Sequence, residues 1–323
     1  ERLEAMRAAA HLDIPFVTLD LEKEYKEGVI DYMIHEYSLG RTPNPDVMCN
    51  REVKFGAFWK WAREHGADYI ATGHYAINKK VGGESRLLAG VDKNKDQSYF
   101  LWTLKQEDLE HVLFPVGHLQ KSEVRELARR FGLPNAEKKD SQGLCFMGKV
   151  DVKEFLKHYI KVQSGDVVNE KKERIGHHPG ALLFTIGERR GFTITEKTPD
   201  DKPYYVIGKD ISTNRITVTN KGEPIYIDDA RQELSGRDMS NGQKSLLTVA
   251  KISNVNWVGR IPGPDEELWA RSRYRAPLYK CIVTSNKDGV VLVRFTEKQE
   301  TLTPGQSLVL YDGDECLGGG ILI

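Results

Sequence analysis

The sequence predicts an α/β amino-terminal domain, followed by a small mixed domain and a carboxyl-terminal β-barrel. In the first part of the 323-residue chain, apolar strand-like runs alternate with helical patterns, which is typical of a parallel sheet with helices on its faces. In the second part, short alternating runs are broken by Gly, Asn and Asp, which is typical of antiparallel hairpins. We expect domains at residues 1–150, 151–238 and 239–323.

The first domain should begin with helices over residues 1–12 and 22–39, with the apolar strand IPFVTLDL between them. A further helical pattern starts at Asn50, a residue type that often caps the start of a helix. The next strand, ADYIATGHYA, contains the run TGHY at its end. Because parallel sheets bind ligands at the carboxyl ends of their strands, Gly73 and His74 are candidate site residues, with a simple strand-ending turn as the alternative.

Two more helices are expected, in KSEVRELARRFG and over residues 151–161, and the loop between them contains Cys145. Asp140 in this loop either orients Cys145 or belongs to a plain turn. The β-rich half should form hairpins in YYVIGKDISTNRITV, KCIVTSNKDGVVLVRF and QSLVLYDGDECLGGGILI, because turn sequences such as Lys-Asp-Gly and Asp-Gly-Asp separate alternating runs.

Composition limits the classes of function. Lysine plus arginine and aspartate plus glutamate each total 47, so any nucleic-acid binding must come from local clusters and not from net charge. The sequence has no apolar run long enough to span a bilayer and no signal-peptide pattern at its start, so we expect a cytoplasmic protein without membrane contact. The four cysteines are scattered without a CxxC pair, so no metal site is expected.

Other residues that could bind metals or react have simpler explanations. His177 and His178 are neighbours, and neighbouring strand residues point to opposite faces, so a turn or strand-end role is expected for them. Cys281 lies in an apolar run and Cys316 lies among glycines, and we expect both to be structural.

A basic stripe is predicted in WARSRYRAPLYK, where a strand would place alternating arginines on one face. Such a stripe, flanked by aromatic rings, could bind phosphates and stack on bases. A solvated strand face is the competing interpretation. The residues are Arg271, Arg273 and Arg275, flanked by Trp269, Tyr274 and Tyr279.

The stretch GRTPNPDVMCN is the most unusual part of the first domain. Pro43 and Pro45 restrict their own backbone and that of the residues before them, so the loop should present Asp46 rigidly. Cys49 would then lie at a helix N-terminus, where the helix dipole favours the reactive thiolate. Cys49 is therefore either a nucleophile or a small buried apolar residue.

Taken together, the motifs resemble those of the bacterial-type tRNA-specific 2-thiouridylases. The matching stretches run in the family's order from residue 14 to the C-terminus: GRTPNPDVMCN, GADYIATGHYA, KDQSYFL, LFPVGHL, DSQGLCFMG, TIGERRGF, RYR, and TPGQ followed by YDGDECLGGG. Members of that family replace the 2-oxygen of the wobble uridine of certain tRNAs with sulfur and consume ATP. The resemblance implies an adenylating α/β domain of the PP-loop (HUP) type with a doubly wound parallel sheet, a small central domain and a β-barrel that contacts tRNA.

The resemblance also implies roles for individual residues. Cys49 corresponds to the family's nucleophile, Cys145 to the cysteine that carries a persulfide, and Asp46 to a general acid or base. Gly73 would contact ATP. The residues implied to contact the target base are Asn44, Pro45 and Asp46, and those implied to contact tRNA are His74, Lys95, Asp96, Gln97, Arg273, Tyr274 and Gln306.

The implied chemistry explains why two thiols are needed. Adenylation turns the carbonyl oxygen of the pyrimidine into a leaving group, and a persulfide supplies the sulfur nucleophile. A second thiol can then break the remaining S–S bond and leave an internal disulfide. ATP, with Mg²⁺, is thus the expected cofactor, and the expected partners are tRNA and a sulfur donor, either a cysteine desulfurase or a sulfur-relay protein.

This chain departs from the family at its start. The family's PP-loop, SGGxDS, whose backbone N–H groups bind ATP phosphates, has no counterpart here, since VGGES lacks the Asp-Ser ending and opens no helix. We expect the chain to be part of a longer enzyme, because a doubly wound sheet without its first strand would expose apolar surface and a strand edge. The alternatives are a catalytically inactive tRNA-binding protein and a PP-loop ligase for a small substrate, which would have little use for RYR or two thiols.

Overall fold

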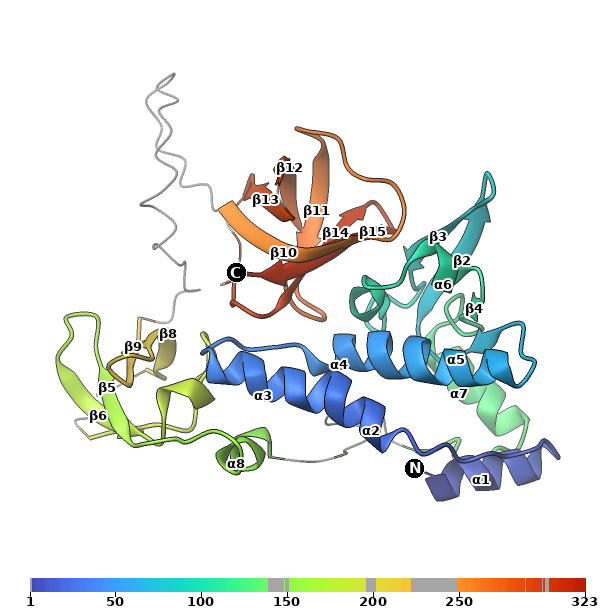
Figure 1. Ribbon diagram of the computed structural model, residues 1–323, viewed down its shortest axis with the longest axis horizontal. Coiled ribbons are helices and arrows are strands. Elements are labelled where there is room, and N and C mark those ends of the chain that lie inside the picture. Colours follow the sequence, from blue (N-terminus) through green and yellow to red (C-terminus); the bar gives the residue numbers. More distant parts are fainter. Residues whose placement is uncertain are drawn as a thin grey trace.

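A computed structural model describes residues 2–138, 148, 151–195, 202–221, 249–287, 289–297, 299 and 302–323. Figure 1 shows three parts: a row of helices with short strands at one end, a small sheet at the other end, and a barrel packed above the row. The fold class predicted from the sequence is therefore confirmed in outline.

The row of helices begins close to where the periodicity predicts. Helix α1 covers Arg2–His11, and a continuous helical run follows a coil segment. This run consists of α2 (Glu22–Tyr25), η1 (Lys26–Ile30) and α3 (Asp31–Ser38). Its buried face includes Val29, Ile30 and Met33. The helices predicted over 1–12 and 22–39 are thus confirmed.

The third helix begins earlier than predicted. Helix α4 (Pro45–Met48) continues into η2 (Cys49–Ala57) and α5 (Phe58–Glu64). Asn44 caps this run, because its side-chain oxygen accepts a hydrogen bond from the Val47 N–H at 3.4 Å, and Pro45 occupies the first helical position, where its missing N–H costs nothing. The prediction that Asn50 is the N-cap is therefore wrong, and Cys49 lies inside the helical run.

The predicted strand IPFVTLDL is also wrong, because residues 14–20 form an extended coil without a strand partner among the described residues. Ile14 and Val17 remain 54% and 63% exposed. A strand forms only where a neighbour supplies backbone hydrogen bonds. Parallel pairing does occur in this domain, between β1 (Ile70–Ala71) and β4 (Val112–Leu113).

The remaining elements of the first domain connect it to the barrel. Strands β2 (Ala76–Val81) and β3 (Glu84–Ala89) form a hairpin, and β3 pairs with the last barrel strand through Leu88 and Glu315. Two short helices and β4 follow, and after them comes a longer helix. This longer helix confirms the prediction made for KSEVRELARRFG. These helices are η3 (Ser98–Leu101), α6 (Gln106–Leu109) and α7 (Lys121–Arg130).

The central part is a five-stranded sheet in the order β7-β6-β5-β9-β8, introduced by helix α8 (Val152–Lys157). Its core includes Leu156, Val167, Phe184 and Val206. The predicted hairpin in YYVIGKDISTNRITV is confirmed as β8–β9. The elements are β5 (Gly165–Val168), β6 (Arg174–His178), η4 (Ala181–Leu183), β7 (Thr193–Ile194), β8 (Tyr205–Asp210) and β9 (Arg215–Thr219).

The last part is a closed barrel in the order β10-β13-β12-β11-β14-β15, with β10 and β15 paired to close it. The two predicted hairpins at Lys-Asp-Gly and Asp-Gly-Asp are confirmed as β12–β13 and β14–β15. The glycine run of β15 allows close approach, since a Cβ at Gly319 would lie 2.4 Å from the Leu308 carbonyl oxygen. The strands are β10 (Val249–Trp257), β11 (Glu267–Arg271), β12 (Tyr279–Lys287), β13 (Val290–Phe295), β14 (Ser307–Asp312) and β15 (Glu315–Leu322).

Candidate functional site

The proline loop, residues 40–46, runs from the end of α3 into the first turn of α4 and is held by contacts on both sides. On the helical side, the Arg41 guanidinium donates to both carboxylate oxygens of the buried Glu36, at 2.6 and 2.5 Å. On the barrel side, the side-chain amide of Gln306 donates to the carbonyl oxygens of Thr42 at 2.9 Å and Pro43 at 3.0 Å. The loop is therefore positioned by the barrel as well as by its own prolines.

Gln306 was predicted to contact tRNA, and its amide lies against the proline loop. The barrel backbone adds to the same contact, because the Thr42 N–H donates to the Pro304 carbonyl oxygen at 2.9 Å. Gly305, with φ +91°, makes this approach possible, since a Cβ there would lie 2.8 Å from the Thr42 carbonyl oxygen. Gln306 thus positions the residues that precede Asn44.

The predicted base-contacting residues and one of the predicted thiols follow directly. Asn44, Pro45 and Asp46 form the cap and first turn of the helical run, and Cys49 lies one turn later. Cys49 is completely buried beside Val47 and Met48. Asp46 and Cys49 are therefore close in sequence and on one helix, but the thiol is shielded from solvent in this conformation.

Cys145, the other predicted thiol, lies outside the described residues, as does Asp140. Cys281 and Cys316 are free and buried, and Cys49 is buried as well. Burial raises the pKa of Cys281 to about 12 and also raises the pKa of Cys316, which agrees with structural roles for both. The predicted disulfide between Cys49 and Cys145 stays a prediction.

Gly73 and His74 lie at the carboxyl end of β1, as the parallel sheet predicts. His74 is buried between the rings of Phe55 and Phe114, and its Nδ1 lies 2.8 Å from the Thr72 hydroxyl. Burial, assisted by the positive charge of Lys54, lowers the pKa of His74 to about 3, so the ring is neutral near pH 7. Gly73 is exposed, and no atom lies within 4 Å of where its Cβ would be.

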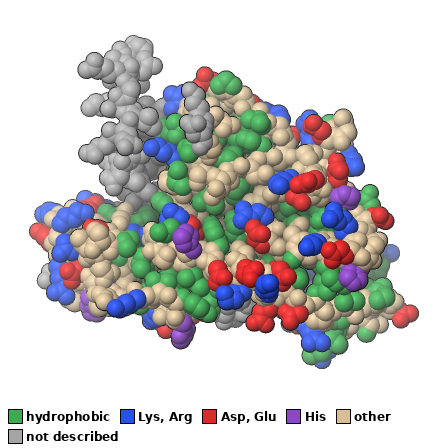
Figure 2. Space-filling model, viewed as in Figure 1, with side chains coloured by type: hydrophobic (Ala, Val, Ile, Leu, Met, Phe, Trp, Pro, Cys, Tyr) green, Lys and Arg blue, Asp and Glu red, His purple; other side chains and the backbone are tan. Residues whose placement is uncertain are grey.

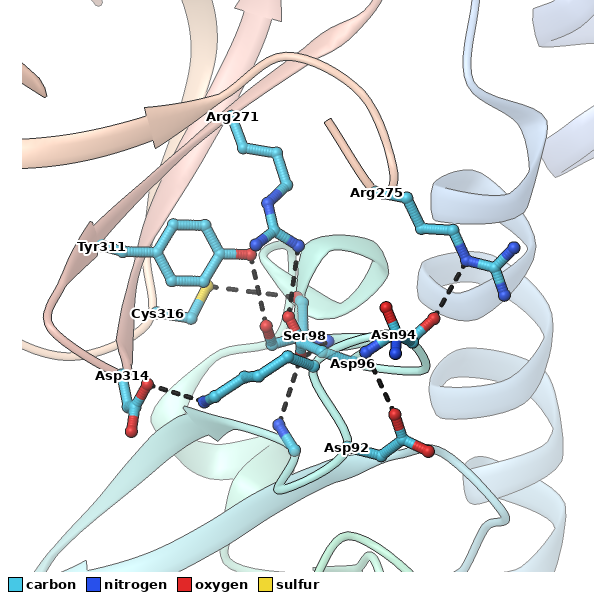
Figure 3. Close-up of polar contacts among 11 residues, drawn as sticks. Asp92, Asn94, Asp96, Ser98, Arg271, Arg275, Tyr311, Asp314 and Cys316 are labelled. Atoms are coloured by element: carbon cyan, nitrogen blue, oxygen red, sulfur yellow. Dashed lines mark hydrogen bonds and ion pairs between the residues drawn. The ribbon is translucent and has the colours of Figure 1, made fainter. Parts of the chain in front are cut away.

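The segment Lys95–Gln97 is fixed to the barrel by a buried polar group that we call the anchoring cluster: Asp96, Ser98, Arg271 and Tyr311 (Figure 3). Asp96 is 2% exposed; one carboxylate oxygen accepts from the N–H groups of Gly90 and Ser98, both at 3.1 Å, and the other lies 3.3 Å from Arg271 Nη1. The Ser98 hydroxyl lies 3.2 Å from that of Tyr311. Asp96 therefore faces the protein interior.

The neighbours of Asp96 link this segment to the other motifs. The Gln97 side-chain oxygen accepts a hydrogen bond from the Tyr75 N–H at 3.0 Å, and the Gln97 N–H donates to the Tyr75 carbonyl oxygen at 2.8 Å. These two bonds connect the KDQSYFL motif to the GADYIATGHYA motif. Lys95 is half-buried. The Tyr99 hydroxyl lies 3.1 Å from the carbonyl oxygens of both Ser272 and Ser307, and it also contacts the Asn44 side chain. The motifs of the first domain thus converge on the barrel.

The predicted basic stripe is wrong, because the chain leaves strand geometry after Arg271. The Ala276 N–H donates to the Arg273 carbonyl in a turn, and Arg275 has φ +64°. The three arginines consequently separate: Arg271 joins the anchoring cluster, Arg273 donates to Ile186 O at 3.2 Å and Thr303 Oγ1 at 2.7 Å, and Arg275 donates to Asn94 O at 3.0 Å. Tyr274 packs against Phe100, with ring centroids 4.7 Å apart.

The surface shows no broad basic field on the face in Figure 2, where acidic and basic side chains are interspersed. This agrees with the formal net charge of +0. Within the described ranges, no group of three His, Cys, Asp or Glu side chains could hold a metal ion, and His177 is exposed while His178 is buried, as expected for neighbours on a strand. No helix in the described part is long and apolar enough to cross a bilayer.

Sequence reasoning missed a cavity of about 370 Å³ between α3, α8 and the turn at residues 185–188. Arg273 contributes to its wall from the barrel. The only signal in the sequence was the stretch TIGERRGF, which matched the family pattern without suggesting a role. The cavity depends on three parts of the chain that are far apart in sequence.

Comparison with known proteins assigns all three parts. Residues 1–149 match the profile described as the tRNA methyl transferase HUP domain, 153–220 match the tRNA methyl transferase PRC-barrel domain, and 248–322 match the aminomethyltransferase beta-barrel domain. The first of these includes the proline loop and β1. The last includes the barrel strands that hold that loop.

Curated relatives match almost the whole chain. The tRNA-specific 2-thiouridylase MnmA of Xanthomonas campestris is 43% identical, with 100% of this chain and 81% of the relative aligned. The protein of the same name from Listeria innocua is 42% identical over 99% of this chain and 81% of its own length. That from Streptococcus equi subsp. zooepidemicus is 44% identical over 97% and 80%.

Proposed function

This chain belongs to the family of tRNA-specific 2-thiouridylases, and on that premise we propose that it replaces the 2-oxygen of the wobble uridine of tRNA with sulfur at the expense of ATP. The observation that carries the proposal is the barrel-held proline loop. Gln306 and Pro304 fix Thr42 and Pro43, and the helix that begins there presents Asp46 and then Cys49. Fixed geometry of this kind is what transfer between two large partners requires.

Asn44, Pro45 and Asp46 are proposed to contact the target base. The cap and the first helical turn hold these residues in one geometry, and the Asn44 side chain is further restrained by Tyr99. Asp46 would move the proton that accompanies loss of the 2-oxygen, as a general acid or base. The neighbouring tRNA contacts would be Lys95, Gln97 and Tyr274. Asp96 would act by positioning the segment that holds Lys95 and Gln97, and Gln306 by positioning the proline loop.

ATP is proposed to bind at the carboxyl end of β1. Gly73 is exposed there and carries no side chain, so its backbone leaves room for a nucleotide to approach. ATP supplies the chemistry that makes the 2-oxygen a leaving group. Mg²⁺ commonly enters such sites with the phosphates and needs few protein ligands, so it is proposed to arrive with ATP.

Sulfur transfer is proposed to use two thiols. The terminal sulfur of a Cys145 persulfide forms a bond to C2 of the base as the activated oxygen departs with its adenylate. Cys49 thiolate then attacks the Cys145 sulfur, which breaks the S–S bond, leaves the transferred sulfur on the base and forms a Cys49–Cys145 disulfide. Because Cys49 is completely buried, its surroundings must open before that step.

The sulfur donor is proposed to be a cysteine desulfurase or a sulfur-relay protein, and the setting the cytoplasm, where reducing systems can reopen the disulfide. The test is an assay of the complete gene product with ATP, a desulfurase and unmodified tRNA, followed by nucleoside mass spectrometry for 2-thiouridine. Failure to thiolate with every donor would refute the proposal.

The thiol assignment has its own test. Cys145→Ser should abolish persulfide loading by the desulfurase, whereas Cys49→Ser should still accept the persulfide but form no internal disulfide. Peptide mass spectrometry should place the extra sulfur on the Cys145 peptide. Cys281→Ser is the matched control, because this thiol is buried in the barrel, and sulfur found on Cys281 would contradict the assignment.

A further inference from the structure

The cavity between the helices, the central sheet and the barrel, which we call the junction pocket, has no role in the proposal above. Its volume of about 370 Å³ lies within the range of small-ligand sites, roughly 300–1,000 Å³. Apolar side chains from α8 and η4 line one part of it, and an aromatic ring and charged groups line the rest. The lining includes Tyr37, Lys153, Leu156, Thr185, Glu188 and Arg273.

The charged groups of the junction pocket are held in place by neighbours. Lys153 Nζ lies 2.5 Å from Glu188 Oε1 and 4.1 Å from the centre of the Phe184 ring, and the other Glu188 oxygen accepts from the Thr185 N–H at 3.1 Å. The Arg273 guanidinium is oriented by the hydrogen bonds that its Nη2 donates to Ile186 and Thr303. No described residue accepts a hydrogen bond from its other N–H groups. The pocket thus combines fixed donors and an acceptor.

The junction pocket adjoins the proline loop. The Thr185 hydroxyl, in the pocket wall, lies 3.1 Å from the Thr42 hydroxyl. Thr42 is two residues before Asn44 and is the residue whose carbonyl oxygen Gln306 holds. The pocket wall is therefore in direct contact with the segment that leads into Asn44–Asp46.

We propose that the junction pocket binds one nucleotide of the tRNA beside the target uridine, with its base against Tyr37 and its phosphate towards Arg273. The inference rests on the proposed function, because it takes tRNA as the substrate. An enzyme that extrudes a base for reaction also unstacks its neighbours, and these need new stacking surfaces. Sites for single-stranded RNA meet this need with an aromatic ring beside cationic groups.

The test measures binding of this chain to an anticodon stem-loop RNA and to copies with one abasic nucleotide on either side of the target uridine. One abasic position should weaken binding by about 5- to 160-fold, the range for loss of one base–aromatic stack. Tyr37→Leu should weaken binding of the intact RNA by a similar factor and should remove the penalty at that position. Tyr37→Phe should retain both affinity and penalty.

Tyr159→Leu is the matched control, since this exposed tyrosine, two residues after α8, is not part of the pocket wall, and it should change neither quantity. A Tyr37→Leu variant that binds every RNA more weakly by one common factor would show only a structural role and overturn the inference. Equal binding of the intact and abasic RNAs would also overturn it. No binding of the intact RNA would overturn the proposed function together with this site.

Discussion

Two arginines that lie two residues apart serve opposite purposes in this protein. Arg271 is enclosed in the anchoring cluster, where its guanidinium meets the carboxylate of Asp96, which is 2% exposed. Arg273 lines the junction pocket and retains N–H groups that no described residue accepts. One short barrel segment thus both connects the domains through Arg271 and leaves N–H donors of Arg273 without an acceptor among the described residues.

The difference extends to the surroundings of the two arginines. Around Arg271, the polar groups of Asp96, Ser98 and Tyr311 pair with one another inside the protein. Around Arg273, the junction pocket lies between domains, and the nearby residues Asn44, Pro45 and Asp46 are only half-buried. We call the surroundings of Arg271 the locked side and those of Arg273, with the proline loop, the open side. Substitutions on the locked side should change the free energy of unfolding, while those on the open side should change tRNA binding and the rate of thiolation.

The largest effect is expected on the open side, from Asp46→Asn. This change keeps the shape of the side chain but removes its capacity for proton transfer, so thiolation should fall by about 10²- to 10⁴-fold while tRNA affinity changes little. Rates of 2-thiouridine formation and filter binding measure the two quantities. Asp31→Asn, at an exposed position on α3, is the control and should leave the rate unchanged. Full activity of the Asp46 variant would show that Asp46 only stabilises the start of the helix.

On the locked side, Arg271→Ala should lower the free energy of unfolding by about 3–5 kcal/mol, because it leaves Asp96 buried without its cation. Urea denaturation measures this quantity. Arg129→Ala removes an exposed ion pair to Glu137 and should cost less than about 1 kcal/mol. Equal costs for the two variants would show that the anchoring cluster does not hold the domains.

A third prediction uses the buried His74 ring, whose pKa is lowered from 6.5 to about 3. The unfolded chain binds a proton below pH 6.5 and the folded chain does not, so stability should be highest above pH 6.5 and fall as the pH decreases towards 3. The slope contributed by His74 is at most about 1.4 kcal/mol per pH unit. Denaturation curves of the wild type and His74→Gln between pH 4 and 7 measure it, and identical slopes would contradict the burial of a neutral ring.

The smallest effect is expected from Arg273→Ala, which removes one positive charge from the open side. If Arg273 meets one phosphate, the variant should bind tRNA more weakly and the slope of log affinity against log salt should decrease in magnitude by about 0.7–0.9. Binding titrations from low to moderate salt measure the slope. Arg215→Ala, at an exposed position of β9, should leave the slope unchanged. An unchanged slope for Arg273→Ala would show that Arg273 makes only its internal hydrogen bonds and no phosphate contact.

Local patterns in the sequence determined the helices and hairpins. The run 22–38 and helix α7 follow from apolar spacing, and the hairpins of the barrel follow from Asp-Gly turns, because these conformations depend on residues close in the chain. The ordered motifs likewise identified the family. Even local reasoning failed at Asn50, where it overlooked the stronger start signal of Asn44 followed by proline.

Only the tertiary structure decided what the individual side chains do. Whether residues 14–20 become a strand depends on a hydrogen-bonding neighbour, and alternation alone cannot supply one. The three arginines separated because a turn after Arg271 directs each towards a partner far away in the sequence: Asp96, Ile186 and Asn94. Burial of Cys49 and the junction pocket arise in the same way, since surface area and cavities are properties of segments that meet in space and not of any one stretch of chain.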